Sequence, residues 1–385
     1  MLAARESGLL TPVVTRDYAP QDLDERGMWD QCVNLEQQLE TSNLRIRDPV
    51  LNEYLVGVMQ RLLPNQADKI RVFAMWSADF NAAMFPNGMM IVNSGFLARA
   101  RNEAQLAAVL GHESGHYLRR HSLQGWRNRR ATSAVMAFVA VGAGAVSGAT
   151  GSNWYDLANA INSGLLLSVF RYSRELEGEA DSYGLQLMAN AGYSPDAASK
   201  IWKQLIEERK ASAAARKKKY RDGAAAALST HPPTEERMGR LAADGMFIER
   251  AKQSGLTYDD GRERWLAATA ALRPAFIDEQ VKQNDPGASL YLIESLAVDG
   301  WDGTLRYYEG EAYRLRDEAG DADRAATSYA AAVEFPDAMP EAHRAHGYAQ
   351  LKKGEVEAGR HALGRYLELR PDASDAAMVR FTLGQ

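Results

Sequence analysis

The segment at residues 109–121, VLGHESGHYLRRH, contains two histidines at the spacing of one face of an α-helix. His112 and His116 are four residues apart, and Glu113 lies between them. Positions i and i+4 of an α-helix share one face, so both imidazoles can reach a single zinc ion. Glu113 projects beside them and can take a proton from zinc-bound water. We therefore predict a helix here, with His112 and His116 as metal ligands and Glu113 as the general base.

A catalytic zinc site needs a third protein ligand and an open position for water. The acidic segment at residues 172–192 has helical spacing and offers Glu175, Glu177 and Glu179. Glu177 and Asp181 are spaced i and i+4 and so share a face, while Glu175 and Glu179 point roughly opposite. A carboxylate one turn beyond the ligand can orient a ligand histidine through its second ring nitrogen. Glu177 is therefore favoured as the third ligand, with Glu179 as the alternative.

Further elements are expected before the metal motif. Residues 48–63 begin with Asp-Pro, a helix start signal, and have apolar residues at helical spacing. Residues 69–77 and 89–97 are typical of strands, and a Pro-Asn-Gly turn signal lies between them. A helical pattern resumes at Asn102. The sequence thus predicts a helix, a small sheet and the metal-binding helix in that order.

The C-terminal part contains an internal repeat. The segment that starts at Gly320, GDADRAATSYAAAVEFPD, aligns with GEVEAGRHALGRYLELRPD, which starts at Gly354. Glu334 and Glu368 have the same offset as the two glycines, and that offset is the tetratricopeptide period. Residues 289–300 fit the second helix of an earlier repeat. We predict a short helical solenoid, with an unrelated helical bundle as the alternative.

Composition excludes some classes of function. The net charge of −5 provides no basic field for phosphate groups, so we expect no nucleic-acid binding. Cys32 is the only cysteine, which excludes a disulfide framework and a thiolate metal site. The opening segment MLAARESGLLTPVV lacks the apolar core of a signal peptide.

Two segments raise the question of membranes and partners. Residues 131–150 are the most apolar, but only about 14 of them run without a polar interruption, whereas a spanning helix needs roughly 20. We expect a buried or lid helix there and no transmembrane helix, with association at a membrane surface as the alternative. Residues 207–221 are basic, which indicates a solvated helix end or loop, or alternatively a docking surface for an acidic partner.

Four segments occur in an order that resembles the gluzincin zinc peptidases of the HtpX, Oma and CAAX-prenyl-protease family: NAAMFPNGMMIVNSGFL, EAQLAAVLGHESGHYLRRHS, SRELEGEADSYGLQLMANAGY and STHPPTEERMGRL. The attached repeats make the chain most similar to the BepA-like periplasmic branch. The resemblance implies an α+β fold, with an N-terminal extension and helix at 1–44 and a mainly helical peptidase domain with a small β-sheet at 45–250. An all-α tetratricopeptide solenoid is expected at 260–385.

The same resemblance implies roles for individual residues. One zinc ion is expected on His112, His116 and Glu177, with Asp181 behind the ligands. His231, which is stiffened by two following prolines, is implied to occupy the fourth zinc position and to keep the enzyme latent; packing within a loop is the alternative. Substrate backbone is expected at the edge of the sheet, where the family pattern falls on Asn81, Ala82, Met89, Met90, Ile91, Val92 and Asn93.

Together these features predict a zinc endopeptidase that cleaves unfolded or misassembled proteins, and the resemblance alone implies a periplasmic location. A polypeptide is the expected substrate, and the repeats are expected to bind a protein partner. The competing hypothesis is a chaperone or assembly factor, in which zinc mainly stabilises the fold and the repeats bind polypeptides.

Overall fold

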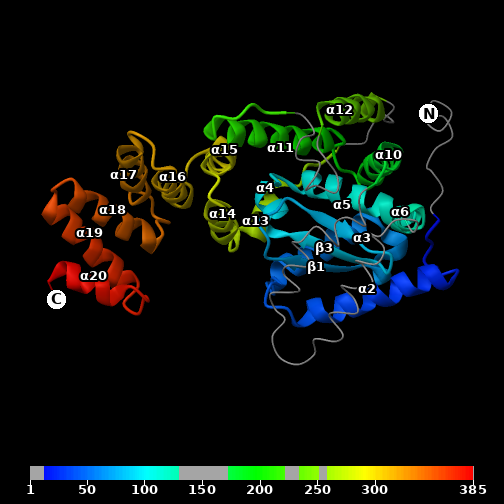
Figure 1. Ribbon diagram of the computed structural model, residues 1–385, viewed down its shortest axis with the longest axis horizontal. Coiled ribbons are helices and arrows are strands. Elements are labelled where there is room, and N and C mark those ends of the chain that lie inside the picture. The colour runs from blue at the N-terminus through cyan, green and yellow to red at the C-terminus, as the bar shows by residue number, and fades with distance from the viewer. Residues whose placement is uncertain (1–12, 130–171, 222–233, 251–257, 385) are drawn as a thin grey trace. The chain divides into compact units, whose positions relative to one another are not determined.

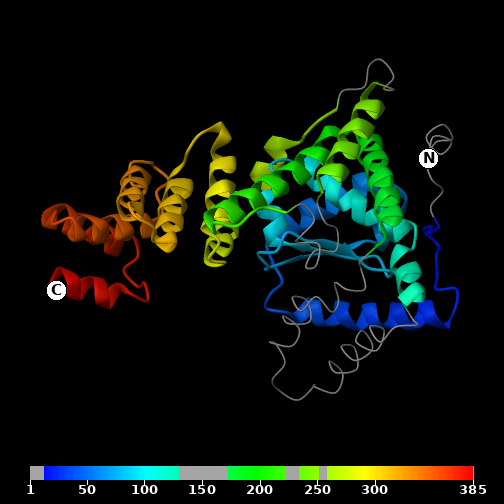
Figure 2. The same cartoon turned by 45° about the horizontal axis from the view of Figure 1, so that its top comes forward.

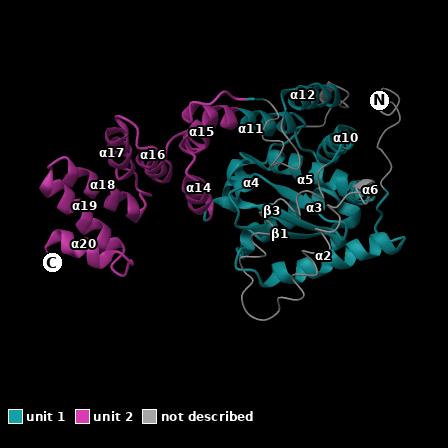
Figure 3. Ribbon diagram, in the orientation of Figure 1, with its two compact units in different colours: residues 1–206, 221–271 teal, residues 207–220, 272–385 magenta. Residues whose placement is uncertain are grey.

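The computed structural model describes residues 13–129, 172–221, 234–250 and 258–384. The chain divides into two compact units, residues 1–206 with 221–271 and residues 207–220 with 272–385 (Figure 3). The predicted limits at 45–250 and 260–385 concern functional domains and stay predictions. His231 and the apolar segment at 131–150 lie outside the described residues. Within the described ranges, no helix has the length and hydropathy that are needed to cross a bilayer.

The first unit is mainly helical and contains one small sheet, which confirms the predicted α+β class. Its elements are α2 (Leu23–Thr41), α3 (Pro49–Leu62), the 3-10 helix η1 (Pro64–Lys69), β1 (Arg71–Met75), β2 (Ala82–Met84), β3 (Met89–Asn93), α4 (Ser94–Arg99), α5 (Glu103–Leu118), α6 (His121–Arg129), α10 (Arg174–Asn190), α11 (Asp196–Ala215), α12 (Glu235–Arg250) and α13 (Arg262–Thr269). The second unit, to which residues 207–215 of α11 belong, contains α14 (Arg273–Lys282), α15 (Pro286–Leu296), η3 (Ala297–Asp299), α16 (Gly303–Arg316), α17 (Asp321–Ala332), α18 (Pro340–Lys352), α19 (Val356–Leu369) and α20 (Ala376–Leu383).

The sheet has the strand order β1-β3-β2, with β3 parallel to β1 and antiparallel to β2. All five residues of β3 pair with β1, and Met90 to Val92 also pair with β2. The prediction that Met89, Met90, Ile91, Val92 and Asn93 form the sheet edge is therefore wrong, because both sides of β3 are occupied. The segment predicted as a strand at 89–97 also ends early, since α4 begins at Ser94.

Helices cover both faces of this sheet. Alternate strand residues, including Phe73, Ala83 and Ile91, form a buried cluster with Cys32 and Leu39 of α2. The intervening residues point to the opposite face, where α5 packs against β2 and α3 packs against β1. Figures 1 and 2 show α2 and α5 on opposite faces of the sheet. One face of the sheet thus packs against α5, the helix that carries His112 and His116.

Helix α5 is fixed at its N-terminus by polar contacts. The Asn102 side chain caps it by accepting a hydrogen bond from the Gln105 amide at 2.9 Å. The next residue, Glu103, is fully buried and accepts hydrogen bonds from Tyr54 at 2.5 Å and Tyr193 at 2.7 Å. Arg264 adds a charged contact at 3.0 Å. These contacts hold the start of α5 in one position.

Glycines allow α5 and α10 to pack closely. A Cβ atom on Gly184 of α10 would lie 2.7 Å from the His112 amide nitrogen. Gly111 and Gly115 of α5 face α10 in the same way, with Gly115 opposite Ala180. Side chains longer than hydrogen would push the helices apart. The glycines therefore bring the acidic helix within reach of the histidines.

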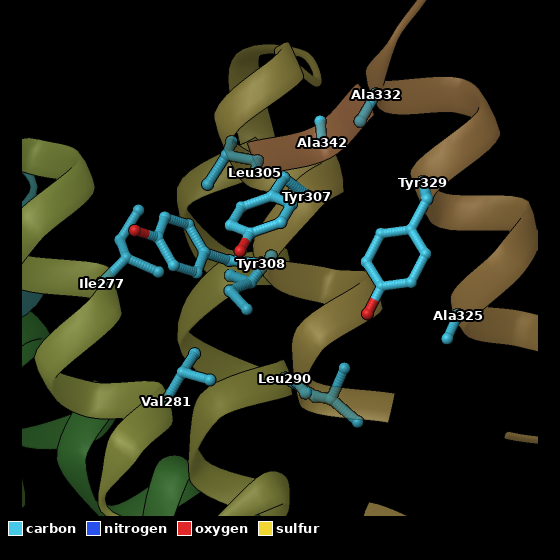
Figure 4. Close-up of a cluster of buried hydrophobic side chains, with 12 residues drawn as sticks. Ile277, Val281, Leu290, Leu305, Tyr307, Tyr308, Ala325, Tyr329, Ala332 and Ala342 are labelled. Atoms are coloured by element: carbon cyan, nitrogen blue, oxygen red, sulfur yellow. The ribbon is translucent and has the colours of Figure 1, made fainter. Parts of the chain in front are cut away.

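The second unit is built from helices that pack in sequence order. Figure 4 shows its main core, in which Tyr307 and Tyr308 of α16 lie among side chains from the neighbouring helices. α16 packs on α17, and α18 packs on α19. The second helix of each pair follows a glycine with positive φ, Gly320 at 83° and Gly354 at 85°.

Candidate metal centre

Helices α5 and α10 bring three potential metal ligands together. His112 Nε2 lies 3.1 Å from His116 Nε2, and Glu177 approaches both, with oxygens 3.6 Å from His112 Nε2 and 3.4 Å from His116 Nε2. Tetrahedral zinc with bonds of about 2.0–2.1 Å keeps neighbouring ligand atoms roughly 3.3 Å apart. All three side chains are buried. The spacing and the donor chemistry therefore fit a zinc ion.

Asp181 lies one turn beyond Glu177 and supports the first ligand. Its Oδ1 is 2.9 Å from His112 Nδ1, the ring nitrogen that faces away from His116 and Glu177. A carboxylate there favours a proton on Nδ1 and leaves the Nε2 lone pair for metal. Both Glu177 and Asp181 occupy the face of α10 that their i, i+4 spacing predicts.

Two arginines of α12 complete the surroundings of Asp181. Arg237 donates to Asp181 Oδ1 at 2.6 Å and Arg240 to Oδ2 at 2.8 Å. Arg237 is 5% exposed, its Nη1 lies 3.4 Å from Glu177, and its guanidinium carbon lies 4.2 Å from the centre of the Trp202 ring. Burial alone would raise the pKa of Asp181, but the Arg237 guanidinium holds it well below its usual range. The Asp181 carboxylate is thus kept ionised beside His112.

Sequence reasoning missed Arg237. Arg237 is far from Asp181 along the chain and lies in a different helix. The i, i+4 spacing that relates residues of one helix therefore cannot reveal this contact. The available signal is its position in STHPPTEERMGRL, where His231 is the more conspicuous residue. Burial of a charged residue cannot be read from such a motif, since most arginines are exposed.

The second histidine of the candidate site has different neighbours. His116 Nδ1 lies 2.8 Å from Nδ1 of the fully buried His121. The ring of Tyr172 stacks on His116 at 3.8 Å between centroids, and the Tyr172 hydroxyl pairs with Ser122 at 2.8 Å. Burial lowers the pKa of His121 to about 4, so this imidazole is neutral at pH 7.

The other two glutamates of α10, Glu175 and Glu179, do not approach both histidines as Glu177 does. Glu179, the alternative ligand, forms an ion pair with Arg119 and lies 3.7 Å from His121 Nε2. Glu175 is exposed in the first turn of the helix. Glu113, the predicted general base, is 4% exposed and follows His112 directly on α5. Of the three candidates on α10, Glu177 is the one within metal distance of both imidazoles.

β2 is one of the two outer strands of the sheet, and its side chains are buried. The Phe85 amide donates to Met89 and the Asn93 amide to the Asn81 carbonyl, so the peptide groups of Asn81 and Phe85 face β3. The pairs alternate along an antiparallel ladder, which turns the amides of Ala82 and Met84 to the outer side. In the part of the chain that the structure describes, no strand pairs with that side. Asn81 and Ala82, unlike β3, thus lie at an edge.

Comparison with known proteins places these elements in a family. The chain is 28% identical over 196 residues to a putative beta-barrel assembly-enhancing protease of Vibrio cholerae, covering 50% of this chain and 39% of the relative. It is 34% identical over 186 residues to the mitochondrial metalloendopeptidase OMA1 of Schizosaccharomyces pombe, 48% of each chain. The beta-barrel assembly-enhancing protease of Escherichia coli is 22% identical over 265 residues, 64% of this chain and 51% of the relative. The chain spans about half or less of the length of these relatives.

The model of peptidase family M48 matches residues 50–244, just over half of the chain. That region holds the helices that carry His112, His116 and Glu177, and also Arg237 and the sheet. The order of motifs, the buried ligand cluster and the family match agree, and the chain is therefore a member of peptidase family M48.

Proposed function

We propose that this protein is a zinc endopeptidase with one zinc ion held by His112, His116 and Glu177. The observation that supports this most directly is the spacing among the ligand atoms of the three buried side chains, at 3.1, 3.4 and 3.6 Å. Three protein ligands leave one tetrahedral position for chemistry, as catalytic zinc sites require. The names of two relatives, a protease and a metalloendopeptidase, agree with this assignment.

The residues divide the work of hydrolysis among them. When bound, the ion would supply Lewis acidity that activates a water molecule and polarises the scissile carbonyl. The Glu113 carboxylate would accept a proton from that water as the carbonyl carbon is attacked, and would then donate it to the leaving amine. Asp181 and Arg237 would keep His112 oriented throughout.

The substrate would bind as an extended strand along the outer side of β2. The amides and carbonyls of Ala82 and Met84 face that side and would hydrogen-bond the substrate main chain. Main-chain recognition demands little sequence specificity, which suits unfolded or misassembled proteins as the substrate class. β2 also packs on α5, so a strand added there would lie near the metal motif.

Replacing Glu113 with Gln tests the assignment. We expect cleavage of denatured casein to fall by about 100-fold or more, the lower range for loss of general-base catalysis, while one equivalent of zinc stays bound. Glu175→Gln, which removes an exposed carboxylate of α10, should leave both properties unchanged. Undiminished cleavage by Glu113→Gln would refute the mechanism. A His231→Ala protein, in which the proposed latch is removed, that binds zinc but cleaves nothing would favour the chaperone hypothesis.

We also propose that His231 occupies the fourth zinc position and keeps the enzyme latent, as the family resemblance implies. An imidazole at that position would exclude the water that Glu113 must deprotonate. His231→Ala should then raise the rate of casein cleavage, measured at equal zinc occupancy. An unchanged or lower rate would instead indicate that His231 packs within its loop or assists the reaction.

The second unit supports a recruitment role. We propose that α16–α17 and α18–α19 are tetratricopeptide repeats. A Cβ on Gly310 would meet Tyr329, and one on Gly347 would meet Leu363; Tyr329 and Leu363 are separated by one tetratricopeptide period. Such repeats would bind a protein partner, and the resemblance to the BepA-like branch implies a periplasmic setting. Cell fractionation and crosslinking from the repeats would test the compartment and the partner.

A further inference from the structure

We infer that His121 is a positioning residue for the metal centre, which fixes the proton of His116 on Nδ1 and thereby presents the His116 Nε2 lone pair to zinc. This inference rests on the proposed zinc site. It concerns a residue that touches neither the substrate nor the ion. It gives the second ligand histidine a dedicated partner, as Asp181 is the partner of the first.

The short contact between the two imidazoles requires one shared proton. The Nδ1 atoms of His116 and His121 are 2.8 Å apart, a distance that demands one donor and one acceptor. If His121 donates, the proton of neutral His116 must sit on Nε2, which faces His112 and Glu177 and could not then bind metal. If His121 accepts, His116 Nε2 is free for zinc. The ligand role of His116 therefore needs His121 to be an acceptor at Nδ1.

Glu179 selects that form of His121. The other ring nitrogen, His121 Nε2, is buried and makes no hydrogen bond to any residue within the described ranges. A carboxylate oxygen, Glu179 Oε2, lies 3.7 Å from His121 Nε2. A proton on Nε2 is attracted by this carboxylate, whereas a lone pair there would be repelled. The negative charge thus places the His121 proton on Nε2 and leaves Nδ1 as the acceptor.

Packing fixes the positions of the His116 and His121 rings relative to each other. His116 and His121 are both fully buried, and their rings meet edge to face at 75°. Tyr172 stacks on His116 at an interplanar angle of 16°, and its ring centroid lies 6.0 Å from that of His121. The chain turns sharply between the two histidines, where Arg120 has a φ of 57°. That left-handed residue follows the end of α5 and lets the ring of His121 face back toward His116.

Two substitutions at His121 separate an acceptor role from simple packing. In His121→Asn, the side-chain oxygen can lie where Nδ1 lies and accept the His116 proton; His121→Leu fills the space without an acceptor. We expect zinc affinity, measured by competition with a chromogenic chelator, to fall by about 10- to 100-fold in His121→Leu, as is usual when a partner of a ligand histidine is lost. His121→Asn should stay within a few-fold of wild type.

Two further measurements keep the test independent of folding and of the enzyme assignment. The unfolding midpoint in chelator shows whether each variant folds, and nitrogen-15 NMR of the unaltered zinc-loaded protein reports the His121 tautomer directly. An Nε2–H tautomer supports the inference, and an Nδ1–H tautomer overturns it. Equal zinc affinity of the folded Leu and wild-type proteins, or equal losses for Leu and Asn, also overturns it. A wild-type protein without stoichiometric zinc would refute the proposed function instead.

Discussion

At the scale of single residues, the sequence predicts what lies one helical turn apart and misses what lies far along the chain. The pairs His112/His116 and Glu177/Asp181 are both spaced i and i+4, and each pair shares a helix face in the structure. Arg237 has no such relation to Asp181, yet it is a buried cation that balances the carboxylates of the site. Charge compensation between distant segments depends on tertiary packing, so spacing cannot reveal it.

Replacement of Arg237 by Met should therefore destabilise the zinc-free protein. Loss of the guanidinium leaves the buried Asp181 with less compensation, and breaking a buried ion pair costs about 3–5 kcal/mol; we expect the lower end, because Arg240 still donates to Asp181. Urea unfolding in the presence of a chelator measures this change. Arg240→Met is the control: that side chain is 36% exposed, so its loss should cost less than about 1 kcal/mol. Equal costs for the two variants would contradict the argument.

At the scale of elements, the sequence predicts helices more accurately than strands. The helix expected at 48–63 is α3, and its Asp48 side chain caps the Leu51 amide at 2.8 Å. The prediction that β3 forms the edge of the sheet is wrong. Its uninterrupted apolar run is instead typical of a strand that is covered on both faces. β2 has three residues, Ala-Ala-Met, of which alanine is depleted in strands. So short an element gives almost no sequence signal, and its edge position follows only from the pairing.

The edge position of β2 leads to a specific prediction for substrate binding. In the inactive Glu113→Gln variant, addition of an unfolded polypeptide should slow hydrogen exchange at the amides of Ala82 and Met84, because these amides would gain main-chain partners. The amides of β3 already pair within the sheet and should change little. Residue-resolved exchange by NMR measures both groups in one experiment. Protection that appears in β3 but not in β2 would place the substrate elsewhere.

At the scale of the whole molecule, the repeat period indicates paired helices, and the motif order indicates a mainly helical domain with a small sheet. Both descriptions of secondary structure hold. The limits of the two compact units could not be predicted from the sequence. Residues 207–220 belong to the same unit as residues 272–385, although they are distant from them along the chain. Asp285 illustrates the reason: it accepts hydrogen bonds from Ser212 at 2.6 Å and Arg216 at 2.9 Å, contacts that no composition shift marks.

Each unit has its own buried core, so damage to the repeats should leave the metal centre intact. In Gly310→Ala the new Cβ would lie 2.3 Å from the Tyr329 ring, and such overpacking costs about 1–3 kcal/mol. Gly364→Ala is the matched control, since no atom lies within 4 Å of its Cβ position and alanine favours the helix by about 1 kcal/mol. Thermal proteolysis should therefore reach α16 and α17 at lower temperature in Gly310→Ala and at no lower temperature in Gly364→Ala. Zinc affinity should equal that of wild type in both variants; a parallel loss of zinc affinity in Gly310→Ala would show that the two units fold as one.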